Sequence, residues 1–249
     1  MKLTILGSGT SAPLLERSNA AYLLEIDNFQ FLLDSGAGTI RRLLEVKADL
    51  FDIDHIFYTH LHNDHINDLG AIIWSNNYGL NRKKPLNLYG PKGFKEYYKI
   101  LLNKLLKPPK LYFDVNIQEL ENSNIEIGEI TIKTHEIKHS STTKSVAYRF
   151  ESKGKSFVYT GDAEYQESIA KVSENCDVLL TECSLPDNKK EEGHLTPSLA
   201  GRIAAKAGVK HLILTHFYPE VLKTGIKRQC SRHFHGKITL AKDKLTINI

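Results

Sequence analysis

Short runs of aliphatic and aromatic residues, separated by turn-forming residues, predict a strand-rich beginning of the chain. Four such runs cover residues 3–6, 21–26, 29–33 and 56–59. Asp27-Asn28 lies between the second and third runs and predicts a hairpin turn there. Apolar side chains recur at helical spacing from Thr39 to about Val46, which predicts a helix before the fourth run.

The second half of the chain combines strand runs with a helix whose ends the sequence marks. The strand runs cover residues 125–134, 146–151, 156–160, 178–181 and 211–215. Thr196 is suited to cap a helix, Pro197 to its first turn and Gly208 to its end. Both halves run from strands to helix, and no linker separates them. We therefore expect a single α/β domain over residues 1–249.

Between the halves, residues 92–107 carry an apolar stripe at helical spacing that Pro108-Pro109 ends. The stripe consists of Phe94, Tyr97, Tyr98, Leu101, Leu102 and Leu105. We interpret it as core rather than as a base-stacking surface, with a homodimer contact as the alternative. The basic residues around it are Arg82, Lys83, Lys84, Lys95, Lys99 and Lys104. They are interpreted as a solvated face rather than as a phosphate-steering patch.

Composition narrows the class of protein only a little. The chain is 41% apolar and 25% charged, as ordinary globular proteins are. The net charge of +4 suits an anionic substrate but does not require a nucleic acid. The three cysteines form no CxxC pair, and no apolar segment is long enough for a signal peptide or a membrane helix. We therefore expect a cytoplasmic protein without a membrane partner.

A cluster of residues that can bind metal follows the predicted strand at 56–59. Four ligand-type residues lie within six positions there: His60, His62, Asp64 and His65. In an extended chain alternate side chains share a face, so His60 and His62 are expected to converge on one ion. The Asp64-His65 pair then points elsewhere, which favours two metal ions over one. Imidazole and carboxylate, without thiolate, suit a hydrolytic first-row metal.

A two-metal site needs about seven protein ligands, so further ligands are expected later in the chain. His139, Asp162 and His216 each follow a predicted strand, and Gly161 allows the loop at Asp162 to approach closely. His135 competes with His139, but it lies where the chain is still expected to be strand.

These motifs resemble the metallo-β-lactamase superfamily, and the likeness runs from Leu6-Gly7-Ser8-Gly9-Thr10 to near the end of the chain. Three further segments resemble its ribonuclease Z-like branch: Leu33-Asp34-Ser35-Gly36, Ser145-Val146-Ala147-Tyr148-Arg149 and Gly193-His194-Leu195-Thr196. The resemblance implies an αββα sandwich of two mixed β-sheets flanked by helices, with metals held at one sheet edge.

The resemblance also implies a role for each matched residue. The implied ligands of one metal are His60, His62, His139 and Asp162, and those of the other are Asp64, His65, Asp162 and His216. A hydroxide that bridges the two ions is then the nucleophile. Zn²⁺ is the expected metal, with Mn²⁺ or Fe²⁺ as alternatives.

Four other roles follow from the same likeness. Asp34 is expected to fix a histidine rather than to bind metal. His194 is expected to face the scissile phosphate and to assist catalysis, and Asp64 to assist proton transfer while it touches its metal. Glu182 is expected either to support a histidine or to be a surface carboxylate.

One departure from that branch bears on the substrate. Only 23 positions separate His139 from Asp162, which leaves room for one hairpin and none for the RNA-binding arm usual in ribonuclease Z enzymes. We therefore expect a dinuclear metal-dependent phosphodiesterase that acts on a small or cyclic phosphodiester or on an RNA end. The alternatives are a hydrolase of lactones, sulfate esters or thioesters, a ribonuclease Z-type tRNA 3′ processing enzyme, and a non-catalytic metal-binding scaffold.

Overall fold

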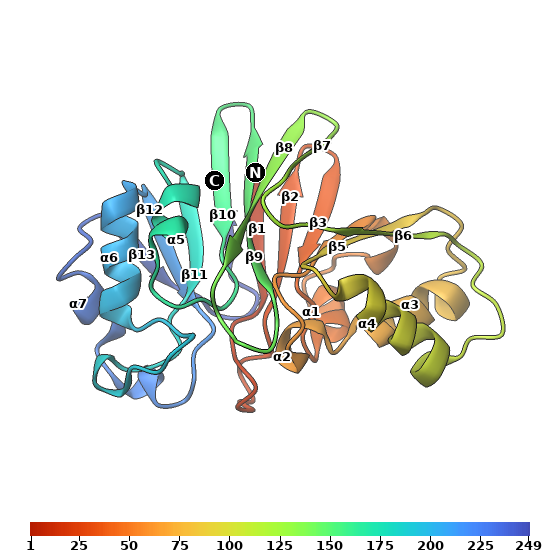
Figure 1. Cartoon of the computed structure of the whole chain (residues 1–249), viewed down its shortest axis with the longest axis horizontal. Helices are drawn as coiled ribbons and strands as arrows, with labels where there is room; N and C mark the ends of the chain where they lie inside the picture. The colour runs from red at the N-terminus through yellow and green to blue at the C-terminus, as the bar shows by residue number, and fades with distance from the viewer.

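The computed structural model describes all 249 residues and shows two β-sheets packed face to face (Figure 1). The first sheet consists, in spatial order, of β14 (Thr246–Asn248), β1 (Lys2–Gly7), β2 (Ala21–Ile26), β3 (Phe29–Leu33), β4 (His55–Phe57), β5 (Leu86–Gly90) and β6 (Val115–Glu119). The second consists of β13 (Lys237–Leu240), β12 (His211–Thr215), β11 (Val178–Glu182), β10 (Lys155–Tyr159), β9 (Ser145–Ser152), β8 (Ile130–Ile137) and β7 (Asn124–Ile127).

Each sheet is antiparallel at one end and parallel at the other. In the first sheet the pairs from β14 to β3 are antiparallel and those from β3 to β6 are parallel. In the second the pairs from β7 to β10 are antiparallel and those from β10 to β13 are parallel. Tight turns join β2 to β3, β7 to β8 and β9 to β10, whereas the parallel strands are joined by crossovers that contain helices.

Helices cover the outer face of each sheet (Figure 1). Those on the first sheet's side are α1 (Thr39–Glu45), α2 (Asn63–Ile66), α3 (Leu69–Trp74) and α4 (Phe94–Ile100), and those on the second are α5 (Glu167–Val172), α6 (Pro197–Ala207) and α7 (Ile226–Cys230). Two π-helical segments extend α3 and α4, namely η2 (Ser75–Gly79) and η3 (Leu101–Leu106). Short 3₁₀ turns are η1 (Leu50–Asp52), η4 (Asp187–Lys189) and η5 (Val221–Lys223). The layers confirm the predicted αββα sandwich.

The core lies between the sheets and beneath the helices. Phe31 and Phe57 of the first sheet meet Phe150 of the second, with ring centroids 5.5 and 5.4 Å apart. A second apolar layer joins the first sheet to α3 and α4, and it includes Phe94 and Tyr98 of the predicted stripe. Burial on both faces explains why inner parallel strands such as β11 and β12 are apolar runs rather than alternating ones.

Most sequence-predicted elements form close to their expected bounds. The hairpin of β2 and β3 turns at Asp27-Asn28, and β12 covers residues 211–215. Helix α6 begins after Thr196 and ends at Gly208, whose φ of 65° is left-handed. Thr196 occupies the capping position, although its side chain makes no capping hydrogen bond.

Three expectations need correction. Residues 125–134 form two strands, β7 and β8, because Gly128, with φ of 59°, turns the chain between them. Strand β4 ends at Phe57, two residues earlier than expected. The helix expected over 92–107 is α4 followed by η3, and the wider π turn leaves Leu105 70% exposed instead of in the core.

The interval between His139 and Asp162 holds one hairpin, as expected. It contains β9 and β10, joined at Lys153-Gly154, and no inserted arm. None of the helices has both the length and the apolar run that crossing a bilayer requires.

Candidate metal centre

The sequence-predicted ligands gather at one edge of the sandwich because strands of both sheets end there. The histidine cluster follows β4, and His139, Asp162 and His216 follow β8, β10 and β12. These three strands of the second sheet share one direction, so their carboxyl ends meet at a common edge. A hydrogen bond of 2.9 Å from the backbone N–H of Val146 to the carbonyl of Thr59 joins the sheets beside the centre.

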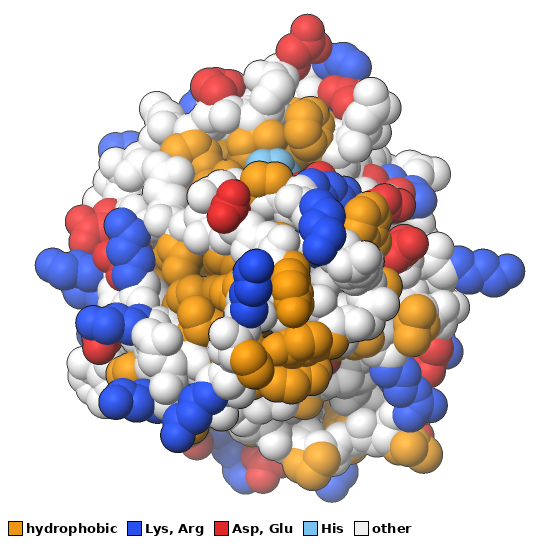
Figure 2. Space-filling view, turned by 90° about the vertical axis from the view of Figure 1, so that its right-hand side faces the viewer, with side chains coloured by type: hydrophobic (Ala, Val, Ile, Leu, Met, Phe, Trp, Pro, Cys, Tyr) orange, Lys and Arg blue, Asp and Glu red, His pale blue; other side chains and the backbone are white.

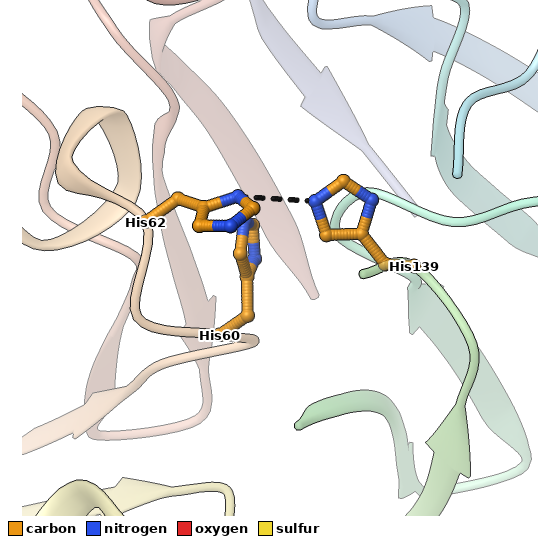
Figure 3. A group of neighbouring side chains, drawn as sticks. All are labelled: His60, His62 and His139. Carbon is orange, nitrogen blue, oxygen red and sulfur yellow. Dashed lines mark hydrogen bonds between the residues drawn. The ribbon is translucent and has the colours of Figure 1, made fainter. Parts of the chain in front are cut away.

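A first group of three imidazoles can surround one ion. His60 and His62 lie in the extended segment after β4, and His139 faces them from the second sheet (Figure 3). Nδ1 of His62 lies 3.1 Å from Nε2 of His139. The rings of His60 and His62 are 4.6 Å apart between centroids, so the three share one small space.

A second group combines Asp64, His65 and His216. Helix α2 begins after His62, and this change of backbone turns Asp64 and His65 away from the first group. Nε2 of His216 lies 3.2 Å from Nε2 of His65 and 3.3 Å from Oδ2 of Asp64. The two groups thus surround different points. The sequence analysis also separates His60 and His62 from Asp64 and His65.

Asp162 lies between the two groups. Its Oδ1 is 3.4 Å from Nε2 of His65, and its Oδ2 is 3.9 Å from Nε2 of His139. Gly161, with φ of 62°, brings this carboxylate in: a Cβ there would lie 2.5 Å from the side chain of Thr59. The carboxylate therefore has one oxygen toward each group.

Outer hydrogen bonds fix the orientation of four of the five histidines. Nδ1 of His65 donates to Oδ2 of Asp34 (2.8 Å), and Nδ1 of His139 donates to the carbonyl of Gly193 (2.8 Å). Nδ1 of His60 donates to the Thr59 hydroxyl (3.1 Å), which itself donates to Asp34. Nδ1 of His216 donates to the Ser184 hydroxyl at 3.0 Å, which in turn donates to the His216 carbonyl. Each Nε2 therefore keeps a free lone pair directed at the centre.

The unpartnered buried atoms fit metal ions in particular. Nε2 of His60 and Oδ1 of Asp162 are buried and have no hydrogen-bond partner. Orphaned buried polar atoms are costly unless something satisfies them. Both atoms are metal-ligand types that point into the centre, so the side chains present fit divalent cations.

Burial and mutual charge set the proton states of the centre. Burial lowers the pKa of His60 well below its usual value and keeps the imidazole neutral, which is the form that binds metal. Burial would raise the pKa of Asp162, but the imidazoles of His216 and His65 outweigh it and hold that pKa well below its usual range. The carboxylate therefore stays ionised and favours a cation beside it.

Asp34 is buried beside the centre and belongs to neither group of ligand-type residues. Its oxygens accept hydrogen bonds from the Thr59 backbone and hydroxyl, from His65 and from the Tyr159 hydroxyl (2.6 Å). Both Asp34 and His216 have φ of 55°, a left-handed conformation that costs free energy in non-glycine residues. The expected supporting position of Asp34 agrees with these contacts.

His194 and Glu182 pair with each other at the edge of the centre, and their ligand-type atoms lie within 4.8 Å of those of His139 and Asp162. Nδ1 of His194 lies 3.0 Å from Oε1 of Glu182, which also accepts from the Ala163 N–H at 2.8 Å. Glu182 is buried, so it is not a surface carboxylate. Burial would lower the pKa of His194, but Glu182 outweighs it and raises that pKa to about 9. The ring of His194 lies 5.1 Å from that of His139.

Sequence reasoning missed several supporting groups. Thr59, Ser184, Tyr159 and the Gly193 carbonyl hold ligand-type residues, yet none was singled out. Thr59 immediately precedes the histidine cluster, and Gly193 belongs to the motif that contains His194, so their positions are the only signal in the sequence. Ser184 has no such signal, because only the fold brings it to His216. His135 lies within β8, as expected.

The family described as "Beta-lactamase superfamily domain" matches residues 30–217, a span that contains every residue of the two groups. The chain belongs to this family.

Two curated relatives cover the whole length of the chain. Ribonuclease Z of Methanothermobacter thermautotrophicus is 26% identical over 301 positions, which cover 100% of this chain and 97% of the relative. The probable metallo-hydrolase YhfI of Bacillus subtilis is 27% identical over 248 positions, which cover 97% of each. Because this chain has 249 residues against 301 aligned positions, the ribonuclease carries at least 52 residues without a counterpart here.

Two solved structures resemble this chain over nearly its whole length. The crystal structure of YhfI from Bacillus subtilis has a TM-score of 0.87 at 25% identity and covers 99% of this chain and 98% of its own. Human tRNase Z, short form, has a TM-score of 0.81 at 26% identity and covers 100% and 99%. The expected ribonuclease Z-like branch and a metal-dependent hydrolase are confirmed.

Proposed function

We propose that residues 1–249 form one dinuclear metal-dependent phosphodiesterase. The observation that supports it most is the convergence of seven ligand-type side chains, with the outward nitrogens of four histidines already hydrogen-bonded. Such preorganisation leaves inward lone pairs that are available to metal ions. A decayed scaffold would be expected to have lost some of these ligands.

The proposed ligands divide as the two groups do. His60, His62 and His139 would hold one ion, and Asp64, His65 and His216 would hold the other. Asp162, which has one oxygen toward each group, would be a ligand of both. When bound, two such ions supply a water of lowered pKa and neutralise charge on the reacting ester. Zn²⁺ suits these ligands best, and Mn²⁺ or Fe²⁺ are the alternatives.

His194 is the proposed proton donor. Its Nδ1 is held by Glu182, so its Nε2 is free to donate to a leaving oxygen or to stabilise charge on a phosphoryl group. Asp64, at the mouth of the second group, is proposed to receive a proton from the attacking water while it remains a ligand.

The proposed substrate is a small or cyclic phosphodiester or an RNA end. Relatives named ribonuclease Z support an RNA phosphodiester, whereas the short β9–β10 hairpin provides no arm to grip a transfer RNA. Hydrolysis of lactones, sulfate esters or thioesters is the second candidate, because the same centre suits those reactions. A cytoplasmic location completes the proposal.

The test is a hydrolase panel on protein stripped with a chelator and reconstituted with Zn²⁺ or Mn²⁺. We expect cleavage of bis(p-nitrophenyl) phosphate and two metal equivalents by elemental analysis. Asp162→Ala should abolish the activity and remove one equivalent, whereas His135→Asn, outside both groups, should change neither. Two bound metal equivalents without hydrolysis of any ester would instead identify a metal-binding scaffold. Efficient cleavage of a transfer RNA precursor would identify the protein as a tRNA 3′ processing enzyme.

A further inference from the structure

The side of the molecule that carries α3 and α4 exposes hydrophobic side chains with basic side chains beside them (Figure 2). Trp74, Tyr78 and Tyr112 are among the exposed hydrophobic residues of this region. We propose that this surface docks single-stranded RNA, with bases stacked on Trp74, Tyr78 and Tyr112 and phosphates neutralised by Lys83 and Lys110. We call these five residues the aromatic platform. The inference rests on the proposed phosphodiesterase function and supplies the RNA contact that the absent arm does not.

The three aromatic side chains are contiguous and open to solvent. Trp74, Tyr78 and Tyr112 are 44%, 43% and 47% exposed. The ring centroids of Trp74 and Tyr78 are 4.7 Å apart, and those of Tyr78 and Tyr112 are 6.5 Å apart. Exposed aromatic side chains are the stacking sites that single-stranded nucleic acids use.

The platform is held rigidly. Asn77 is buried, and its amide donates to the carbonyl of Lys110 (2.8 Å) and accepts from the N–H of Tyr112 (2.8 Å). These bonds fasten the segment that carries Tyr112 onto η2, which carries Tyr78. A preordered surface loses less conformational entropy when it binds a flexible strand.

Charge on this segment favours an anionic occupant. Residues 74–114 contain nine basic and two acidic residues, a net charge of +7, whereas the rest of the chain contains 24 basic and 27 acidic residues, a net charge of −3. The ammonium groups of Lys83 and Lys110 lie 5.1 and 5.4 Å from the ring centroid of Tyr112, and neither forms an ion pair with a carboxylate. A second copy of the chain on this face would place +7 against +7. A polyphosphate strand neutralises the same charge.

The platform follows the metal-ligand segment closely along the chain. Trp74 is the last residue of α3, nine positions after His65 of α2, and only Asn67 and Asp68 separate the two helices. The platform therefore begins in the same crossover between β4 and β5 that carries the histidine cluster.

Trp74 is the sole tryptophan of the chain and reports on its own site. We would titrate the full chain as purified with a short oligoadenylate whose linkages are phosphorothioates, and follow the Trp74 emission. Stacking predicts saturable quenching and an affinity that falls as salt rises. The Tyr78→Ala/Tyr112→Ala double variant should weaken binding by roughly 5- to 150-fold for each ring, the effect usual for a base–aromatic stack.

Matched variants separate the surface from the catalytic centre. Lys83→Ala/Lys110→Ala should reduce the slope of log affinity against log salt by about 1.4. Lys227→Ala/Lys237→Ala, which removes two exposed lysines elsewhere, should leave the slope unchanged. All these variants should cleave bis(p-nitrophenyl) phosphate as the parent does, so a failure here is distinguishable from a failure of the proposed function.

Two results would overturn the proposal. One is an unchanged Trp74 emission at saturating oligoadenylate and low salt. The other is a dimer, detected by light scattering, that the Tyr78→Ala/Tyr112→Ala variant dissociates, since that result assigns the surface to a second copy of the chain.

Discussion

Single hydrogen bonds outside the candidate metal centre decide which nitrogen of each histidine is available to a metal. His65 and His60 both depend on Asp34, the first directly and the second through the Thr59 hydroxyl. Nδ1 of His216 lies 3.0 Å from the Ser184 hydroxyl and 3.2 Å from Oδ1 of Asp162. These partners make the ligand positions sensitive to substitutions that touch no metal.

At this scale Asp34→Asn is the sharpest test. Oδ2 of Asp34 accepts hydrogen bonds from His65, Thr59 and Tyr159. An amide NH₂ in its place would be a donor that faces these three donors, so the hydrogen bonds would be lost. We expect metal affinity, measured by competition with a chromogenic chelator, to fall by about 10- to 100-fold. Asp177→Asn is the matched control, because its carboxylate also accepts backbone and hydroxyl donors but lies away from the centre. Equal metal affinity in both variants would contradict the role of Asp34.

His194→Ala tests the proton donor. Since His194 is not one of the seven proposed ligands, the variant should retain two metal equivalents by elemental analysis. Its kcat on bis(p-nitrophenyl) phosphate should fall by about 100-fold or more, the usual scale for a lost general acid. Loss of a metal equivalent would show that His194 is a ligand.

Elements bring these residues together by ending at the same edge, and the loop after β10 shows how narrow the fit is. A Cβ on Gly161 would lie 2.5 Å from the Thr59 side chain, whereas one on Gly154 meets nothing within 4 Å, although both glycines have positive φ. An alanine at either position would have the same unfavourable positive φ, but only the alanine at 161 would contact another side chain.

Gly161→Ala and Gly154→Ala therefore form a matched pair. Both should lose about 1–2 kcal/mol through the left-handed backbone, and Gly161→Ala should lose about 1–3 kcal/mol more through the contact with Thr59. Urea unfolding measures the free energy of unfolding. Gly161→Ala alone should also weaken metal binding, because Asp162 shifts with the loop. Similar stabilities would show that the loop has room to relax.

Strand β12 begins with a histidine that should make stability depend on pH. Burial lowers the pKa of His211 to about 4, below the usual value of an unfolded histidine, and its Nε2 lies 2.9 Å from the Thr239 hydroxyl. Between about pH 6.5 and pH 4 the unfolded chain binds this proton and the folded chain does not, so stability falls as pH falls. The loss in His211→Gln should be smaller over that window, measured by thermal unfolding. The same dependence of stability on pH in the parent and in His211→Gln would contradict this role of His211.

For the whole molecule, metal binding and folding are linked because the seven ligand-type residues come together only in the folded chain. At free metal 100-fold above Kd, binding contributes about 2.7 kcal/mol, which corresponds to a Tm shift of roughly 5–10 °C for a protein of this size. Chelation should lower Tm by that amount in the parent, and by less in Asp162→Ala. An unchanged Tm in the parent would contradict a metal centre formed by folding.

The sequence by itself determined the elements whose signals are local. Turn residues and apolar runs placed the β2–β3 hairpin, β12 and the ends of α6. It also indicated the ligand-type residues, because each follows a strand whose hydrophobicity is visible in the chain. The 23 positions between His139 and Asp162 determined the absence of an arm, because length alone limits what an interval can hold.

Only the tertiary structure decided which atoms face the centre and which support them. Ser184, Glu182 and the Gly193 carbonyl reach His216, His194 and His139 from other segments of the chain. No local pattern records a contact between distant segments. The same reason applies to Leu105, which a helical period places in the core and a π turn exposes. Periodicity fixes a face only while the backbone keeps its period, and packing decides where that period changes.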